Sequence, residues 1–319
     1  RCGRASAAGV WTSTERPTME RPNLSGLAAY GGYRMASIAA RGLPGFAAQA
    51  LAPTVGLGAN FASPQRRAIV ARHLRRADPT LSGIRLRRAV QEAFDSYARY
   101  WLESFRLPHL PARTVAKGME VDGFEHVQAG LDAGGGVILA LPHLGGWEWA
   151  GRWLADQGIG LTVVVEQVEP PELFEWFVDM RSRLGMNVVA LGDGAAREVL
   201  AALGRNDIVC LLCDRDIQRT GVDVEFFGER TTLPPGPAML SLRTGAPLLP
   251  TAVYFTDRTD GHLGVVRPPL TIERRGDGLR ADVATLTQLL AHELEHLIRR
   301  APQQWHMMQP NWPSDPGYT

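Results

Sequence analysis

A histidine and a glutamate, His143 and Glu148, flank two glycines in the stretch PHLGGWE over 142–148. An imidazole held by a carboxylate keeps one ring nitrogen basic, and that nitrogen can take a proton from a substrate hydroxyl. Five residues along one continuous helix turn the side chain through about 500°, so the two residues cannot share a helix face. We therefore expect them to flank a turn, which the glycines allow. The spacing predicts a general base, His143, and the carboxylate that orients it, Glu148.

The flanking residues place this pair at one edge of a sheet. Residues 136–141 have the apolar pattern of a buried strand, and 147–157 have that of a helix. His143 is then at the carboxyl end of a strand and Glu148 in the first turn of the next helix, where open α/β sheets bind ligands. Taken alone, the spacing also suits a loop histidine beside an unrelated surface glutamate.

Another histidine pair, His292 and His296, lies in the stretch HELEH over 292–296 and matches the His-Glu-x-x-His pattern of zinc metalloproteases. In that pattern both imidazoles bind zinc from one helix face and the glutamate acts as the base. The neighbouring glutamate and arginines indicate a solvated, charge-paired helix instead, and no third ligand follows at a suitable spacing. A zinc-dependent hydrolase is therefore the less favoured alternative, and we expect no metal site.

Short apolar runs alternate with helical stretches after residue 108, which predicts an α/β unit with a central, mostly parallel β-sheet flanked by helices. Cys210 and Cys213 lie in or beside an apolar run, so we expect buried thiols rather than redox chemistry. The expected strands are 136–141, 161–165, 188–190, 208–212, 247–254 and 263–266, and the expected helices are 147–157, 172–184, 195–203, 236–244 and 283–300.

Residues 23–107 differ in character and have helical patterns. Residues 24–51 are rich in small and apolar residues, and 66–88 carry eight arginines and one aspartate. We predict a helical membrane-contact region, with the arginines near anionic headgroups; the alternative is a pair of ordinary packing helices with a solvated charged face. The aromatic residues within 90–105 recur at three- and four-residue spacing, which predicts core.

Composition excludes several classes of protein. The net charge of +1 does not suit a nucleic-acid binder, so no nucleic-acid partner is expected. Three cysteines are too few for a disulfide framework, which favours a reducing compartment. No run of about 18 apolar residues occurs, so a soluble or peripheral protein is expected. Residues 1–22 are polar and are expected to be disordered or an extension outside the fold.

The residues around His143 resemble the lysophospholipid and lipid A acyltransferase superfamily, whose HX4E or HX4D signature follows a strand. Further blocks fall in the order seen in the lipid A branch, and they are FVDMR over 177–181 with Gly185, CDRD over 213–216 with Gly221, FFG over 226–228, PGPA over 235–238, TGAP over 244–247 and WHM over 305–307. Within that branch, LPHLGGWEWAG over 141–151 and WHMMQP over 305–310 look most like actinobacterial phosphatidylinositol mannoside acyltransferases.

This resemblance implies a glycerolphosphate-acyltransferase-like fold, in which 108–315 form an α/β core continuous with the helical region 23–107 as one domain. It implies an acyl-CoA-dependent O-acyltransferase that moves a long acyl chain, typically palmitoyl, to the 6-hydroxyl of a mannose of phosphatidylinositol mannosides. The reaction is expected at the cytoplasmic face of the plasma membrane, to which the protein binds peripherally. Acyl-CoA is then a co-substrate, a glycolipid is the acceptor, and no cofactor is needed.

Motif matches to this family suggest roles for four residues. His143 is the base and Glu148 its partner; Arg181 is a contact near the thioester, and Asp214 is an acid near the histidine. Arg181, His143 and Asp214 are also expected to contact the substrates. Transfer is expected to be direct, without an acyl-enzyme. The open alternatives are an acyltransferase acting on a lysophospholipid or lipid A precursor, and a catalytically idle module that only binds lipid.

Overall fold

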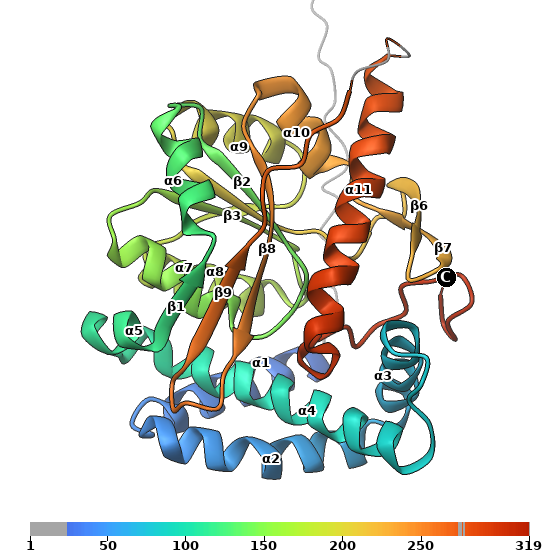
Figure 1. The fold of residues 1–319 in the computed structure, drawn as a ribbon. Helices are drawn as coiled ribbons and strands as arrows, with labels where there is room; N and C mark the ends of the chain where they lie inside the picture. Colours follow the sequence, from blue (N-terminus) through green and yellow to red (C-terminus); the bar gives the residue numbers. More distant parts are fainter. Residues whose placement is uncertain (1–23, 274–275, 277, 319) are drawn as a thin grey trace, which may run out of the picture.

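The computed structural model describes residues 24–273, 276 and 278–318, so the prediction for residues 1–22 concerns residues outside this part of the chain. An all-helical N-terminal part precedes alternating strands and helices (Figure 1). The helices are α1 (Leu24–Ala40), α2 (Gly45–Ala62), α3 (Pro64–Ala77), α4 (Gly83–Arg106), α5 (Ala112–Gly118), α6 (Phe124–Asp132), α7 (Trp147–Asp156), α8 (Pro171–Arg183), α9 (Ala195–Gly204), α10 (Gly236–Thr244) and α11 (Leu279–Arg300), with short 3-10 turns η1 (Leu107–His109) and η2 (Pro302–Gln304). The strands are β1 (Met119–Asp122), β2 (Val137–Leu141), β3 (Leu161–Val165), β4 (Asn187–Ala190), β5 (Ile208–Leu212), β6 (Val222–Phe226), β7 (Glu229–Leu233), β8 (Leu248–Phe255) and β9 (His262–Val266).

A seven-stranded sheet in the order β1-β9-β8-β2-β5-β3-β4 forms the centre of the molecule. Strands β8, β2, β5, β3 and β4 are parallel to one another, whereas β9 is antiparallel to β8 and parallel to β1. This mostly parallel sheet with helices packed around it confirms the predicted fold class (Figure 1). Strands β6 and β7 form a separate antiparallel hairpin. The prediction missed β1, β6 and β7 because their sequences, MEVD, VDVEF and ERTTL, mix charged and apolar residues and lack an apolar run.

Strand β2 is buried on both faces, as its unbroken apolar sequence requires. Ile138 and Ala140 pack into the apolar cluster that α9, α10 and α11 cover. Val137, Leu139 and Leu141 point the other way, into the cluster formed with α5, α6 and α7. The strand that precedes His143 is therefore held rigidly between two layers of helices, and its carboxyl end is a well-defined platform.

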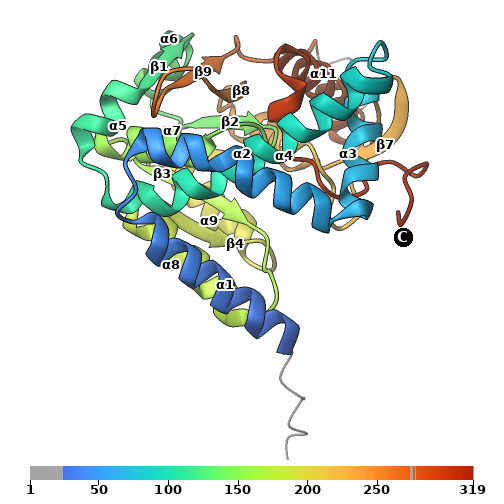
Figure 2. The same cartoon turned by 90° about the horizontal axis from the view of Figure 1, so that it is seen from below.

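Helices α1 to α4 lie along one edge of the sheet, and Figure 2 shows α2 lying across α4 and α1 running beside α8. Helix α2 approaches α4 closely because small residues recur at every fourth position of its inner face, Ala48, Ala52 and Gly56. A Cβ atom at Gly56 would collide with Asp95 of α4. Within 24–273, 276 and 278–318, no helix combines the length and apolar content that a membrane crossing requires. The division at residues 107 and 108 stays a prediction.

Candidate active site

The loop between β2 and α7 holds His143 in a defined place. Gly145 adopts a positive φ of 61°, and a Cβ atom there would collide with the carbonyl oxygen of Val253. The amide of Gly145 donates to Gln304 O at 3.0 Å, and the amide of Gly146 donates to Val253 O at 3.1 Å. Helix α7 begins one residue later, at Trp147. The two glycines therefore make the turn that their sequence position predicts.

The imidazole of His143 is held by Asp214. Nδ1 of His143 lies 2.6 Å from Oδ1 of Asp214, and the main-chain N–H of His143 donates to Oδ2 of Asp214 at 3.0 Å. The Asp214 carboxylate is fully buried, whereas the His143 side chain is 29% exposed. With its proton on Nδ1, the imidazole has a basic Nε2 that no described residue hydrogen-bonds. The pair has the geometry of a general base and its orienting acid.

Neighbouring strands bring these two residues together. Strands β2 and β5 are paired in parallel, with Leu141 opposite Leu212, so the chain leaves both strands at the same edge of the sheet. Cys213 continues the pairing, because its amide donates to Leu141 O at 3.0 Å. Asp214 then stands beside His143. Burial by itself would raise the pKa of Asp214, but the charge of His143 and hydrogen bonds from His143 and Trp305 hold that pKa below its usual value.

Glu148 belongs to a different network. Its Oε1 accepts hydrogen bonds from Arg181 Nη2 at 2.6 Å, Arg181 Nε at 3.0 Å and the Tyr100 hydroxyl at 3.1 Å. Burial would lower the pKa of Arg181, but the carboxylate of Glu148 raises it, so the guanidinium stays charged. Burial, followed by the charge of Glu148, raises the pKa of Tyr100 and keeps it a neutral donor. This buried ion pair ties α7 to α8 and α4.

The four residues singled out from the sequence therefore form two pairs, His143 with Asp214 and Glu148 with Arg181. The expectation that Glu148 orients the imidazole needs correction, since Asp214 occupies that place in the structure. The physical reason is that the first turn of α7 directs the Glu148 side chain toward α4 and α8, where a guanidinium and a phenol bind it. Trp147 lies against both networks, with ring centroids 5.8 Å from His143 and 4.2 Å from Tyr100.

The C-terminal segment, defined here as residues 304–315, returns to this site. The indole N–H of Trp305 donates to Oδ2 of Asp214 at 2.7 Å, and the amide of His306 donates to the main-chain oxygen of His143 at 2.7 Å. Both residues stood in a motif that was recognised in the sequence without a role. Tyr100 was also missed, because its place in an aromatic stripe indicated only core packing.

A neutral histidine lines the same region. The His306 side chain is buried, its Nε2 lies 2.9 Å from Ser96 Oγ, and within the described residues its Nδ1 has no hydrogen-bond partner. Burial, with a smaller contribution from the charge of His143, lowers the pKa of His306 to about 3. His306 therefore adds no positive charge beside His143.

The other candidate groups lie apart from this chemistry. Cys213 is buried as predicted, whereas Cys210 is only half-buried. Burial raises the pKa of Cys210 to about 12 and also raises the pKa of Cys213, which disfavours the reactive thiolate at both positions. His292 and His296 are exposed on α11, and Glu293 between them binds Arg267 at 2.9 Å. Among the described residues, no group of three His, Cys, Asp or Glu side chains could hold a metal ion.

His143 and Asp214, in contact at the carboxyl end of two paired parallel strands, have a geometry that suits transfer to a hydroxyl. The model of the bacterial lipid A biosynthesis acyltransferase family matches residues 32–314, and the chain belongs to this family of acyltransferases. It is similar to a phosphatidylinositol mannoside acyltransferase of Mycobacterium tuberculosis, with 43% identity over 70% of each chain. A phosphatidylinositol mannoside acyltransferase of Mycolicibacterium smegmatis is 41% identical over 71% of this chain and 73% of its own. A lipid A biosynthesis lauroyltransferase of Escherichia coli is 26% identical over 76% of this chain and 77% of its own.

Proposed function

We propose that this protein transfers a long acyl chain, palmitoyl, from acyl-CoA to the 6-hydroxyl of a mannose of phosphatidylinositol mannosides. The observation that carries the proposal is the His143–Asp214 contact of 2.6 Å, which leaves a basic Nε2 at the edge of the sheet, in a chain 43% identical to a phosphatidylinositol mannoside acyltransferase. The assignment of the acceptor lipid rests on the names of these relatives and on the sequence resemblance. The mannose position and the palmitoyl chain rest on the resemblance.

In the proposed mechanism, Nε2 of His143 removes the proton of the mannose hydroxyl as its oxygen attacks the thioester carbonyl carbon. A tetrahedral oxyanion forms and collapses, the carbon–sulfur bond breaks, and the coenzyme A thiolate leaves. The imidazolium returns its proton to that thiolate. Buried Asp214 stabilises the imidazolium between these two transfers, and no acyl-enzyme is needed.

Arg181 is the favoured group for stabilising the oxyanion. The alternative donors are the amides of Gly145 and Gly146, but both already donate to main-chain carbonyls. The Arg181 side chain is 15% exposed while it is bound to Glu148, so it is not completely enclosed by protein. A preorganised donor of this kind often stabilises the transition state by about 3 kcal/mol. Glu148 then acts by holding Arg181 in place.

Apolar residues near the site support a place for the acyl chain. Strands β3 and β5 lie inside the sheet, yet their carboxyl-terminal halves, 163–165 and 210–212, are only half-buried. These residues include valines and leucines, which suit a hydrocarbon chain. Phe226 and Phe227, by contrast, are buried against Trp305 and Trp312, so they belong to the core.

The acceptor can be tested by measuring coenzyme A release with palmitoyl-CoA and a panel of lipids, with products identified by mass spectrometry. The panel holds phosphatidylinositol mannosides, phosphatidylinositol without mannose, a lysophospholipid and a lipid A precursor. We expect thiol release and a palmitoylated product with the mannosylated lipids, at a kcat/KM at least about tenfold above that with the others. Preferred transfer to the lysophospholipid or the lipid A precursor would establish the alternative acyltransferase, and binding without thiol release would indicate an idle lipid-binding module.

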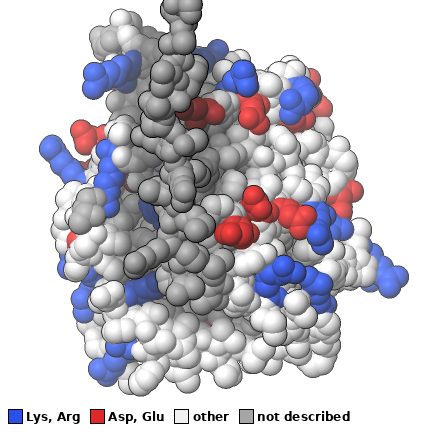
Figure 3. Space-filling model, turned by 180° about the vertical axis from the view of Figure 1, so that it is seen from behind, with Lys and Arg blue, Asp and Glu red and all other residues white. Residues whose placement is uncertain are grey.

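We further propose that α2 rests on the cytoplasmic face of the plasma membrane. Its sequence, GFAAQALAPTVGLGANFA, has no charged residue, and the face opposite α4 exposes Phe46, Leu57 and Phe61 by 68%, 60% and 85%. Figure 3 shows basic and acidic side chains interspersed over the part of the drawn face that is not grey. The lower edge of the molecule, where Figure 1 places α2, is mostly uncharged in the same view. An apolar helix at one edge suits an interfacial contact.

Changing both Phe46 and Phe61 to serine is expected to lower binding to anionic phosphatidylglycerol vesicles at least about tenfold, measured by co-sedimentation. Burial of one phenylalanine stabilises by about 1.5–3 kcal/mol, and about 1.4 kcal/mol corresponds to a factor of ten. Turnover of a detergent-dispersed acceptor should stay within about twofold. The matched control is Leu200→Ser with Leu289→Ser, two other exposed apolar residues on α9 and α11. Equal vesicle binding by both double variants and the parent would contradict a contact through α2.

A further inference from the structure

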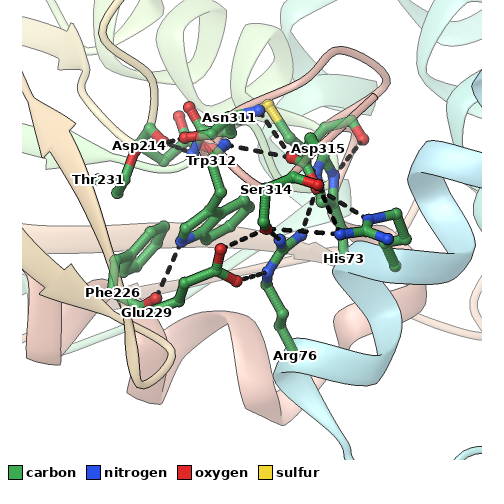
Figure 4. A network of polar contacts seen from close by, with 12 residues as sticks. His73, Arg76, Asp214, Phe226, Glu229, Thr231, Asn311, Trp312, Ser314 and Asp315 are labelled. Carbon is green, nitrogen blue, oxygen red and sulfur yellow. Dashed lines mark hydrogen bonds and ion pairs between the residues drawn. The ribbon is translucent and has the colours of Figure 1, made fainter. Parts of the chain in front are cut away.

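The main chain of Asp214 is held by a residue to which the proposed mechanism gives no role. The side-chain amide Nδ2 of Asn311 donates to the main-chain oxygen of Asp214 at 3.0 Å. Both residues are buried, with exposed fractions of 3% and 0%, so water does not replace this contact readily. Figure 4 shows Asn311 beside Asp214. Asn311 therefore helps to determine where the Asp214 carboxylate stands.

Asn311 is in turn held by Asp315. Oδ2 of Asp315 accepts the main-chain N–H of Asn311 at 3.0 Å and that of Trp312 at 3.1 Å. The same carboxylate binds three cationic or polar side chains of α3, which are Arg72 at 3.1 Å, His73 at 3.0 Å and Arg76 at 2.8 Å. Figure 4 shows Asp315 between Asn311 and the side chains of α3. This one carboxylate fixes the turn over 311–315 against α3.

The contacts around Asp315 favour its ionised carboxylate. Burial would raise the pKa of Asp315, but hydrogen bonds from His73, Asn311 and Arg76 hold it far below its usual value. His73 presents both ring nitrogens to oxygen acceptors, Asp315 and the carbonyl of Met307, and only the doubly protonated imidazole satisfies both. Arg76 also lies over the ring of Trp312, 4.1 Å from its centroid. The turn that carries Asn311 therefore has little freedom to move.

We propose that Asn311 is a positioning residue for acyl transfer, which acts through Asp214 on His143, and that Asp315 fixes Asn311 in place. The inference rests on the proposed function, because it concerns the same histidine. The contact that depends on the position of Asp214 joins His143 Nδ1 and Asp214 Oδ1 at 2.6 Å. Misplacing a catalytic group by about 1 Å can cost about 10² in rate, so a small shift of the Asp214 main chain is enough to lower turnover.

The test is Asn311→Ala in the full chain, with palmitoyl-CoA and a phosphatidylinositol mannoside as substrates. We expect kcat to fall at least about tenfold, while the Kd for palmitoyl-CoA stays within about twofold because Asn311 is buried away from solvent. The downfield proton resonance of His143 Nδ1, assigned by its loss in His143→Ala, should shift or broaden. Asn311→Ser, whose hydroxyl is too short to reach the Asp214 oxygen, should behave in the same way and serves if the alanine variant does not fold.

A matched control is Thr287→Val, which removes another buried hydrogen bond, from Thr287 Oγ1 to Val283 O inside α11. This control should lower the melting temperature but leave kcat and the His143 resonance unchanged. Asp315→Asn should also lower kcat, and adding it to Asn311→Ala should lower kcat by less than about twofold more, because both changes act through one residue. A folded Asn311 variant with kcat within about twofold of the parent, or with an unchanged resonance, would overturn the proposal. Full additivity would remove the role of Asp315.

Failure of this inference can be distinguished from failure of the proposed function. If His143→Ala and Asp214→Asn lose kcat while a folded Asn311 variant keeps it, the proposed base stands and only the role of Asn311 is wrong. If His143→Ala keeps kcat, the proposed role of His143 as the base is wrong, whatever the Asn311 variants do. If the parent protein transfers no acyl group to phosphatidylinositol mannosides, the proposed function itself is wrong.

Discussion

Replacement of His143 by alanine is expected to lower kcat for acyl transfer by at least about 10², because a positioned general base contributes roughly 10² to 10⁴. The side chain is 29% exposed in a loop whose shape depends on main-chain hydrogen bonds, so folding should change little. The measurement is coenzyme A release at saturating palmitoyl-CoA and phosphatidylinositol mannoside. Thermal unfolding of the same preparation shows whether the variant is folded.

The matched controls for this variant are His292→Ala and His296→Ala on α11. Both imidazoles are exposed, and the proposed mechanism gives them no role, so kcat should stay within about twofold of the parent. A zinc-dependent hydrolase would show the reverse pattern, with loss in the α11 variants and none at His143. Equal turnover by His143→Ala and the parent would remove this imidazole from the mechanism.

Replacement of Asp214 by asparagine is expected to have an effect of similar size, again at least about 10² in kcat. An amide holds the imidazole in the wrong tautomer and does not stabilise the imidazolium, and loss of the orienting carboxylate in the serine protease triad costs about 10⁴. Asp214 is fully buried and hydrogen-bonded to His143 and Trp305, so we expect this change to act through the imidazole rather than on binding of the acyl donor. The Kd for palmitoyl-CoA should therefore stay within about twofold.

Comparison with Glu148 decides which carboxylate serves the histidine. A double variant, Glu148→Gln with Arg181→Met, removes both charges of the ion pair and leaves no buried charge without a partner. We expect it to weaken palmitoyl-CoA binding, which Asp214→Asn should not do, and to leave the downfield His143 proton in place. If Asp214→Asn keeps its turnover while Glu148→Gln alone abolishes the His143 resonance, the assignment made from the structure is wrong and the one made from the motif is right.

Much of the sheet could be predicted because several of its inner strands are short, continuous apolar runs. The runs at 161–165 and 208–212 are observed as β3 and β5 with the predicted bounds. A short apolar run between turn residues is typical of a strand inside a parallel sheet. Edge strand β1 and the hairpin β6–β7 escaped prediction because solvent reaches one face of each, and their alternating charged residues resemble loops.

The arginine-rich stretch 66–88 shows how one pattern can serve two purposes. Most of its arginines are exposed, as a solvated face predicts, but Arg72 and Arg76 bind Asp315 near the other end of the chain. The sequence does not reveal these contacts, because an aspartate far along the chain could equally lie in an exposed loop or in a buried ion pair. Only the packing of α3 against the C-terminal segment separates these arginines from their neighbours.

The place of His143 follows from its immediate neighbours. A buried strand, a glycine turn and a helix start are properties of adjacent residues, and they are enough to put an imidazole at the carboxyl edge of a sheet. The partner of that imidazole depends on strand order, which local patterns do not encode. Because β5 pairs with β2, Asp214 reaches His143 across 71 residues, while packing against α4 and α8 draws Glu148, five residues away, to Arg181.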